Sequence, residues 1–176
     1  MIDVGKFLQV VMGEHNGCPV AIKNLDPQIY VTAGFERVMI EKEITALRHL
    51  KGLRHLKGLR YVIELLEVII TDRKYFLTTE YFLGQTLRKY LPTLQRVKRL
   101  YNIFLQLALG LSQIHSKGLS YGDIKIDNVM NLSQHEIKYI DFGSADTTNF
   151  ECDLIALGNV SKGLILQVRS FEEIPF

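Results

Sequence analysis

The strongest signal in this 176-residue sequence is a pair of acidic motifs, Tyr121-Gly122-Asp123-Ile124-Lys125-Ile126-Asp127-Asn128 and Asp141-Phe142-Gly143. Either motif alone carries little information, because an isolated loop carboxylate often does no more than cap a turn. Their arrangement carries more. Asp141 follows Asn128 by thirteen positions, behind an expected hairpin whose return strand is Lys138-Tyr139-Ile140. The two motifs and their spacing together indicate one polar site.

The first motif resembles the catalytic loop H-R-D-x-K-x-x-N of the eukaryotic-like protein kinase superfamily, and the second resembles its D-F-G motif. Four further segments match the superfamily in chain order. They are a V-A-I-K strand at 19–23, a helix glutamate at Glu43, a hinge at 78–87 and the start of a central C-lobe helix at 153–158. The resemblance therefore covers essentially the whole chain.

The resemblance implies an α+β, bilobal kinase-like fold formed by one domain, residues 1–176. We expect a small β-rich N-lobe with the hinge over 1–83, and a truncated helical C-lobe over 84–176. Hydrophobic patterning agrees, since it predicts mostly strands first and mostly helices afterwards. The expected strands cover 7–12, 19–23, 62–71 and 74–81, and the expected helices cover 35–50, 87–91, 94–115 and 154–168.

The resemblance also implies a set of site residues, with ATP and Mg²⁺ as the expected cofactors. Lys23 would hold the α- and β-phosphates, Glu43 would orient it, and Thr79 would be the gatekeeper. The expected catalytic positions are Asp123, Lys125 and Asn128, and the expected metal ligands are Asn128 and Asp141. The expected nucleotide-binding positions are Gly5, Val10, Ala21, Lys23, Glu43, Thr79, Glu80, Phe82, Met130 and Asp141. The expected spine between the lobes is Leu47, Leu65, Tyr121 and Phe142, above Asp153.

These residue types suit the chemistry, because phosphoryl transfer needs positioning and charge neutralisation more than covalent help. Asp141 and Asn128 offer the oxygen ligands that Mg²⁺ prefers. Asp123 can accept a hydrogen bond from the attacking hydroxyl, and Lys125 can reach the migrating phosphoryl group as a point charge. A lysine at position 125 resembles serine/threonine kinases more than tyrosine kinases.

Three departures from the superfamily pattern concern nucleotide binding and regulation. The glycine-rich loop keeps only Gly5 and has Leu8 in its third glycine position, so we expect weak ATP affinity. Tyr-Gly at 121–122 replaces the His-Arg of H-R-D, and only twelve steps separate Asp141 from Asp153. An activation segment and its phosphorylation switch have no room there, an economy similar to that of RIO-type kinases.

Two features lie outside the shared pattern. The hexapeptide Arg-His-Leu-Lys-Gly-Leu occurs in tandem at 48–53 and 54–59. This indicates a local insertion that forms a solvated basic extension or, alternatively, docks an acidic or phosphorylated partner. The C-terminal helix should also expose an apolar face that binds a partner or self-associates. The residues of that face are Leu154, Ile155, Leu157, Leu164, Ile165 and Val168.

Composition indicates a folded protein, because 47% of the residues are hydrophobic and the net charge is only +2. That charge gives no sign of nucleic-acid binding. No apolar run reaches the roughly 18 residues of a membrane span, and no secretion signal begins the sequence. We therefore expect a soluble intracellular protein with reduced Cys18 and Cys152, in the cytoplasm of its own or of a host cell.

The expected function is that of a minimal serine/threonine protein kinase, which passes the γ-phosphoryl group of ATP to a hydroxyl of a protein substrate. Two alternatives stay open. Leu8 and the short segment after Asp141 favour a pseudokinase that binds partners without efficient transfer. The pattern G-D-x-x-x-x-N also occurs in aminoglycoside-type phosphotransferases, which keeps a small-molecule kinase open as the third reading.

Overall fold

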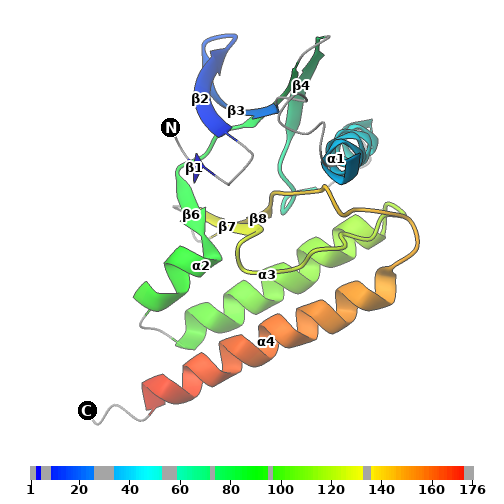
Figure 1. Ribbon diagram of the computed structural model, residues 1–176. Coiled ribbons are helices and arrows are strands. Elements are labelled where there is room, and N and C mark those ends of the chain that lie inside the picture. The colour runs from blue at the N-terminus through cyan, green and yellow to red at the C-terminus, as the bar shows by residue number, and fades with distance from the viewer. Residues whose placement is uncertain are drawn as a thin grey trace.

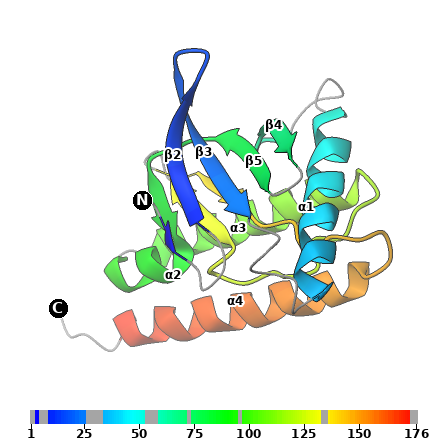
Figure 2. The same cartoon turned by 45° about the horizontal axis from the view of Figure 1, so that its top comes forward.

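A five-stranded sheet and one long helix lie at one end of the molecule, and two further long helices lie at the other end (Figure 1). The computed structural model describes residues 3–4, 9–25, 34–52, 59–71, 74–94, 97–132 and 136–172. Within them, a five-stranded antiparallel sheet has the order β1-β2-β3-β5-β4. Helix α1 (Gly34–Gly52) lies beside this sheet (Figure 2). The expected α+β class is confirmed. The strands are β1 (Asp3–Val4), β2 (Gln9–His15), β3 (Cys18–Leu25), β4 (Leu65–Ile70) and β5 (Tyr75–Glu80).

The hairpin between β2 and β3 is tighter than the sequence indicated. The expected strands at 7–12 and 19–23 left the residues between them for the connection, but β2 continues to His15 and the turn is only Asn16 and Gly17. Both turn residues have positive φ angles, 52° and 76°. A two-residue turn with both φ angles positive matches the right-handed twist of the flanking strands, and Asn-Gly is the preferred pair for it.

A second sheet of three short strands, with the order β6-β7-β8, was only partly expected. The sequence indicated a hairpin here, which is formed by β7 (Val129–Leu132) and β8 (Ile137–Tyr139). It did not indicate β6 (Gly84–Thr86), which pairs with β7. A Cβ atom at Gly84 would lie 2.5 Å from the carbonyl oxygen of Asn131. Glycine therefore permits the close approach of these two strands.

Two long helices lie side by side at the end of the molecule away from the five-stranded sheet (Figures 1 and 2). They are α3 (Val97–His115) and α4 (Phe150–Glu172), and a short helix α2 (Leu87–Tyr90) with a 3-10 turn (Leu91–Thr93) precedes them. Leu94 was expected to begin the long helix but is extended, with φ −84° and ψ 126°. None of the helices in the described ranges is long and apolar enough to cross a membrane.

The core runs through both halves of the molecule. The expected spine residues Leu47, Leu65, Tyr121 and Phe142 are all buried, and the Tyr121 and Phe142 rings meet edge-to-face with centroids 5.0 Å apart. Edge-to-face contact is a favourable geometry for aromatic rings. Helix α3 adds buried side chains at helical spacing, which are Leu100, Ile103, Leu107, Leu111 and Ile114.

The apolar face expected on the C-terminal helix is only partly exposed. Leu154, Ile155 and Ile165 are exposed, as expected, but Leu157 is half-buried. The expectation was wrong for Leu164, which is only 4% exposed because it lies on the side of α4 that joins the core. The Val168 side chain lies outside the described residues.

The first copy of the tandem hexapeptide extends α1 to Gly52, whereas residues 53–58 lie outside the described part of the chain. Two of its basic side chains bind carbonyl groups of this chain. The imidazole Nε2 of His49 lies 2.9 Å from the oxygen of Lys117, and Lys51 Nζ donates to the oxygen of Leu66 at 2.6 Å. This part of the repeat therefore helps to attach α1 to its neighbours.

Candidate active site

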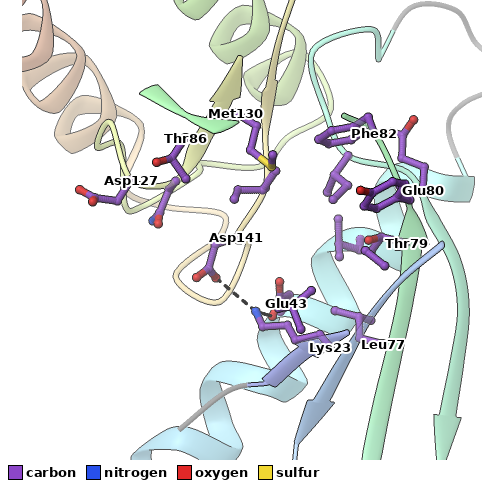
Figure 3. Close-up of a pocket in the computed structure, with 17 residues that line it drawn as sticks. Lys23, Glu43, Leu77, Thr79, Glu80, Phe82, Thr86, Asp127, Met130 and Asp141 are labelled. Atoms are coloured by element: carbon purple, nitrogen blue, oxygen red, sulfur yellow. Dashed lines mark hydrogen bonds and ion pairs between the residues drawn. The ribbon is translucent and has the colours of Figure 1, made fainter. Parts of the chain in front are cut away.

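A cavity of about 390 Å³ lies between the five-stranded sheet and the loops that precede and follow the β7–β8 hairpin (Figure 3). Its walls are mainly apolar with a few polar groups, which is typical of ligand sites. Ten positions expected from the sequence line it, namely Val10, Ala21, Lys23, Glu43, Thr79, Glu80, Phe82, Asn128, Met130 and Asp141. The others are Leu47, Ile63, Leu77, Tyr81, Thr86, Asp127 and Ile140. The expected position Gly5 lies outside the described residues.

The Lys23 side chain lies between Glu43 and Asp141 at one end of the cavity (Figure 3). It lies on β3, its Nζ donates to Glu43 Oε2 of α1 at 2.6 Å, and the same Nζ lies 3.9 Å from Asp141 Oδ1. The side chains of Lys23 and Glu43 are only 17% and 8% exposed. Charges shielded from water interact more strongly than surface charges. The structure therefore brings the ammonium group and two carboxylates together at one end of the cavity.

The environment of Glu43 makes this ion pair sensitive to acid. Burial raises the pKa of Glu43 above its usual value of 4.5, and the nearby Lys23 ammonium offsets part of that rise. The carboxylate of Asp141 raises the pKa of Glu43 further. Glu43 therefore takes up a proton more readily than an exposed glutamate, and protonation removes the charge that holds Lys23.

The three expected catalytic side chains form one hydrogen-bonded cluster at the edge of the cavity. Lys125 Nζ donates to Asp123 Oδ2 at 2.5 Å. The Nδ2 group of Asn128 donates to the same carboxylate oxygen at 2.8 Å and to the backbone oxygen of Asp123 at 3.1 Å. Asn128 lines the cavity, whereas Asp123 and Lys125 do not. The Asp123 carboxylate is thus held in place beside the cavity rather than inside it.

The start of this loop is held by Asp153 of α4, which the sequence analysis placed next to the spine residues. Asp153 is fully buried, and its carboxylate accepts hydrogen bonds from the backbone N–H groups of Tyr121 at 2.6 Å and Gly122 at 2.8 Å. The ring nitrogen Nε2 of His115, at the end of α3, lies 2.8 Å from the same carboxylate. A buried carboxylate with several partners is a rigid support, because losing any partner is costly. His115 was not expected at this position.

Gly122 stands where the superfamily has arginine, and the structure gives a physical reason. Its φ angle is +81°, a conformation that glycine adopts without strain. A Cβ atom there would lie 2.3 Å from the backbone oxygen of Ser144. Ser144 belongs to the connection that leads from Asp141 to α4. Packing against this connection therefore requires glycine at position 122.

That connection is anchored by Asp146. Its backbone pairs with Ser120, with N–O distances of 2.8 and 3.2 Å. Its carboxylate oxygen Oδ1 accepts hydrogen bonds from the Ser120 hydroxyl at 2.5 Å and from the N–H groups of Thr148 and Asn149 at 2.8 and 3.0 Å. Partial burial raises the pKa of Asp146, but these hydrogen bonds outweigh it and hold the pKa well below its usual range. Asp146 thus fixes the start of α4 next to the loop at 121–128.

The sequence did not predict an ion pair between α2 and the loop at 121–128. The Arg88 guanidinium contacts both carboxylate oxygens of Asp127, Nε to Oδ1 and Nη2 to Oδ2. The hydrogen bond from Arg88 lowers the pKa of Asp127, and that of Arg88 is raised in turn. The two residues lie 39 positions apart. Nothing in the pattern of the sequence pairs them.

The hinge is also connected to the second sheet. The Glu80 N–H donates to the backbone oxygen of Glu64 at 3.0 Å, and Glu80 Oε1 accepts from the Glu64 N–H at 2.7 Å. Lys138 of β8 donates to Glu80 Oε1 as well, and its Nζ lies 5.8 Å from the centre of the Phe82 ring. The gatekeeper candidate Thr79 is buried. These contacts fix the hinge relative to Glu64 and to β8 of the second sheet.

The residues present fit a Mg²⁺ ion that is shared with phosphate groups. Within the described ranges, no cluster of three or more His, Cys, Asp or Glu side chains could hold a metal by itself. Asp141 and Asn128 line the cavity together, and the hydrogen bonds of Asn128 to Asp123 use its Nδ2 group, so Asn128 Oδ1 and the Asp141 carboxylate would be the oxygen ligands. Mg²⁺ is commonly bound by one or two such oxygen ligands plus substrate phosphates and water.

Comparison with known proteins agrees with this geometry. The protein kinase domain family matches residues 2–155. CBL-interacting protein kinase 25 of Oryza sativa subsp. japonica is 29% identical over 160 residues, which cover 86% of this chain and 30% of that protein. CBL-interacting serine/threonine-protein kinase 13 of Arabidopsis thaliana is 31% identical over 146 residues, which cover 81% of this chain and 28% of that protein. Maternal embryonic leucine zipper kinase of Xenopus laevis is 30% identical over 146 residues, which cover 81% of this chain and 21% of that protein.

The chain thus spans less than a third of the length of these curated relatives. The family match, in contrast, extends from the first strand into α4 and includes every residue of the site described above. On this ground, the chain belongs to the protein kinase family.

Proposed function

We propose that this chain transfers the γ-phosphoryl group of ATP to a serine or threonine hydroxyl of a protein substrate. The observation that carries the proposal is the position of Lys23, whose Nζ lies 2.6 Å from Glu43 and 3.9 Å from Asp141 at the end of one cavity. Phosphoryl transfer is catalysed mainly by positioning and by electrostatic stabilisation. A partly buried ammonium group with two carboxylates beside it supplies both.

In this proposal the nucleotide lies along the cavity. The adenine ring contacts backbone groups of Glu80 and Phe82 at the hinge, between the apolar side chains of Val10, Ala21 and Met130. The Lys23 ammonium group holds the phosphates, and the buried Glu43 fixes the direction of the lysine side chain. Asp141 and Asn128 would hold Mg²⁺, which neutralises phosphate charge when it is bound.

The acceptor hydroxyl would then be oriented by Asp123, whose carboxylate accepts its hydrogen bond and finally its proton. The acceptor oxygen forms a bond to the γ-phosphorus as the bond to the bridging oxygen breaks, and ADP leaves. The Lys125 ammonium group, 2.5 Å from Asp123, lies close enough to neutralise charge on the transferred group. Asn128 keeps the Asp123 carboxylate in position through its own hydrogen bond.

Two observations support serine or threonine as the acceptor. Lys125 stands two residues after Asp123, as in kinases of that type, and a relative carries the name serine/threonine-protein kinase. The proposal treats the chain as one domain whose N-lobe and C-lobe meet at Leu83 and Gly84. The order of the elements supports this proposal, since the five-stranded sheet and α1 precede this point and α3 and α4 follow it (Figure 1).

The test is incubation of the purified chain with γ-labelled ATP, Mg²⁺, a generic protein substrate and a panel of small hydroxyl compounds. Asp123→Ala and Asp141→Ala are the test variants, and Glu14→Ala, in the β2–β3 hairpin, is the control. Transfer to serine or threonine of protein that is lost in both test variants supports the proposal. Transfer only to small molecules would instead identify a small-molecule kinase. Metal-dependent nucleotide binding without any transfer would identify a binding module.

A further inference from the structure

We infer that two copies of this chain associate through the exposed sides of α3 and α4, with the two α4 helices antiparallel across a two-fold axis. The inference does not depend on the proposed function. In each copy α3 and α4 lie side by side at the end of the molecule away from the five-stranded sheet (Figures 1 and 2). They run in opposite directions, because His115 at the end of α3 contacts Asp153 at the start of α4.

The sides of these two helices that the core leaves uncovered are rich in apolar residues. We call this surface the α3–α4 face. Each of its apolar residues is between 38% and 66% exposed. They are Val97, Tyr101, Phe104, Leu105 and Leu109 of α3, and Leu154, Ile155, Ile165 and Leu166 of α4.

The size of the α3–α4 face fits a protein partner. At about 150–200 Å² of accessible surface for a fully exposed large apolar residue, the exposed fractions of these residues correspond to roughly 800 Å². The largest apolar patch on a typical monomer covers only about 300–600 Å². A stable protein interface covers about 800 Å² on each partner. The face is therefore large enough for a stable dimer.

The spacing of the apolar residues on α4 identifies a second copy of this chain as the partner. Eleven positions separate Leu154 from Ile165 and likewise Ile155 from Leu166, which is about three helical turns, so two parallel rows form. Both pairs of neighbours lie equally far from Val160. A two-fold axis at the level of Val160 therefore sets Leu154 against Ile165 of the second copy. It sets Ile155 against Leu166 in the same way, so the surface complements itself, as a two-fold interface requires.

The residues between these two rows permit a close approach of the helices. Gly158 is exposed, and a Cβ atom built there meets no atom within 4 Å. In the antiparallel arrangement Gly158 lies opposite Lys162 of the second copy. The apolar stem of a lysine can cover the glycine while its ammonium group stays in water. The arrangement therefore buries no charge at its centre.

Helix α3 extends the contact on one side. Because α3 and α4 are antiparallel and His115 lies beside Asp153, Leu105 and Leu109 lie at about the level of Val160. They extend the interface onto α3 of the second copy. The result is two layers of two helices, a packing that buries apolar stripes in helix bundles. None of the residues of the α3–α4 face lines the cavity that contains Lys23, so that cavity stays open in the dimer.

The experiment is sedimentation velocity of the purified full chain across the micromolar range. We expect a dimer, and a melting temperature that rises with protein concentration, because association stabilises the folded chain. Leu154→Lys and Ile165→Glu, each made alone, should raise the dissociation constant roughly tenfold or more, because each sets a charge against an apolar side chain. Ile70→Lys replaces an exposed isoleucine of β4 and should leave the dimer intact. Far-UV circular dichroism checks that each variant keeps its helices.

The double variant Leu154→Lys/Ile165→Glu tests the pairing itself. Within one helix the two positions are about 16 Å apart, too far for the new charges to pair with each other. Across the two-fold axis, each new ammonium group lies opposite a new carboxylate, and this pair occurs twice. The double variant should therefore dimerise more tightly than either single variant.

These measurements can contradict the inference in three ways. A chain that is monomeric throughout the range would overturn it, and so would a dimer that neither single variant weakens. A double variant that dimerises no better than the single variants would overturn the antiparallel pairing on which the inference rests. None of these readouts involves phosphoryl transfer, so the inference and the proposed function fail separately.

Discussion

Arg88 of α2 holds Asp127 of the catalytic loop through two parallel contacts, Nε to Oδ1 at 2.5 Å and Nη2 to Oδ2 at 2.7 Å. The Arg88 backbone N–H also donates to the oxygen of Ile126 at 3.1 Å. A guanidinium–carboxylate fork fixes direction as well as distance. Asp127 lines the cavity that contains Lys23, and Ile126 lines a second cavity of about 420 Å³, which Gly163 of α4 also lines. One arginine therefore positions the loop segment that separates the two.

Replacing Arg88 by Gln should lower the rate of phosphoryl transfer roughly tenfold, because even a small displacement of the loop misplaces Asp123. The melting temperature should change little, since the two side chains are 61% and 40% exposed and surface ion pairs contribute little to stability. The measurement is kcat at saturating ATP together with thermal melting. Lys89→Gln, an exposed position on the same helix, is the control. An unchanged kcat in Arg88→Gln would contradict the positioning role.

Gly122→Ala should destabilise the fold more than Gly118→Ala, although both glycines have similar φ angles, +81° and +75°. The left-handed conformation alone costs an alanine about 1–2 kcal/mol. At position 118 the new Cβ atom meets nothing within 4 Å, whereas at position 122 it would lie 2.3 Å from the oxygen of Ser144. We expect losses of about 1 kcal/mol for Gly118→Ala and about 3 kcal/mol or more for Gly122→Ala, measured by urea denaturation. Equal losses would show that the Ser144 contact has no consequence.

Asp153→Ala should lower the free energy of unfolding by about 2–5 kcal/mol. The substitution leaves the buried N–H group of Tyr121, and the N–H group of Gly122, without the carboxylate that now accepts from both. Asp153→Asn keeps one oxygen acceptor, so its loss should be clearly smaller. Denaturant titration of the two variants measures the difference. If Asp153→Ala were no worse than Asp153→Asn, the carboxylate would not be the support of the loop.

Asp146→Asn should destabilise the protein at pH 7 but not at low pH. The folded-state pKa of Asp146 is depressed, so its carboxylate contributes stability above the unfolded-state pKa of about 3.9. That contribution is lost as the pH falls through the lower folded-state pKa. The melting temperature of Asp146→Asn should therefore lie several degrees below wild type at pH 7, and the gap should narrow below about pH 3.9. Glu14→Gln, an exposed acid on β2, is the control. A gap that does not depend on pH would rule out the charge as its cause.

Much of the fold could be predicted from local pattern. Apolar patterning indicated a long helix over 94–115, which is α3 from Val97 to His115, and β-prone runs indicated β2 to β5. The predictions were incomplete or wrong where the structure depends on strand pairing or on the packing of helices against their neighbours. β6 is only three residues long, too short for a periodic signal, and it forms because Gly84 can approach the backbone of Asn131. The sequence places Leu164 in an apolar helix. Which side of that helix is buried depends on the elements that pack against α4, and the sequence does not show these.

The sequence by itself determined the family, the order of most elements and the candidates Lys23, Glu43, Asn128 and Asp141, because these are properties of residue type and spacing along the chain. Tertiary structure alone decided how they are held. The fork between Arg88 and Asp127, the support of the loop by Asp153 and the cavity beside Gly163 join residues that are far apart in the sequence. The acidic motifs on which the prediction began are thus placed by backbone packing, and the Ser144 oxygen, 2.3 Å from where a Cβ atom of residue 122 would lie, explains why glycine precedes Asp123.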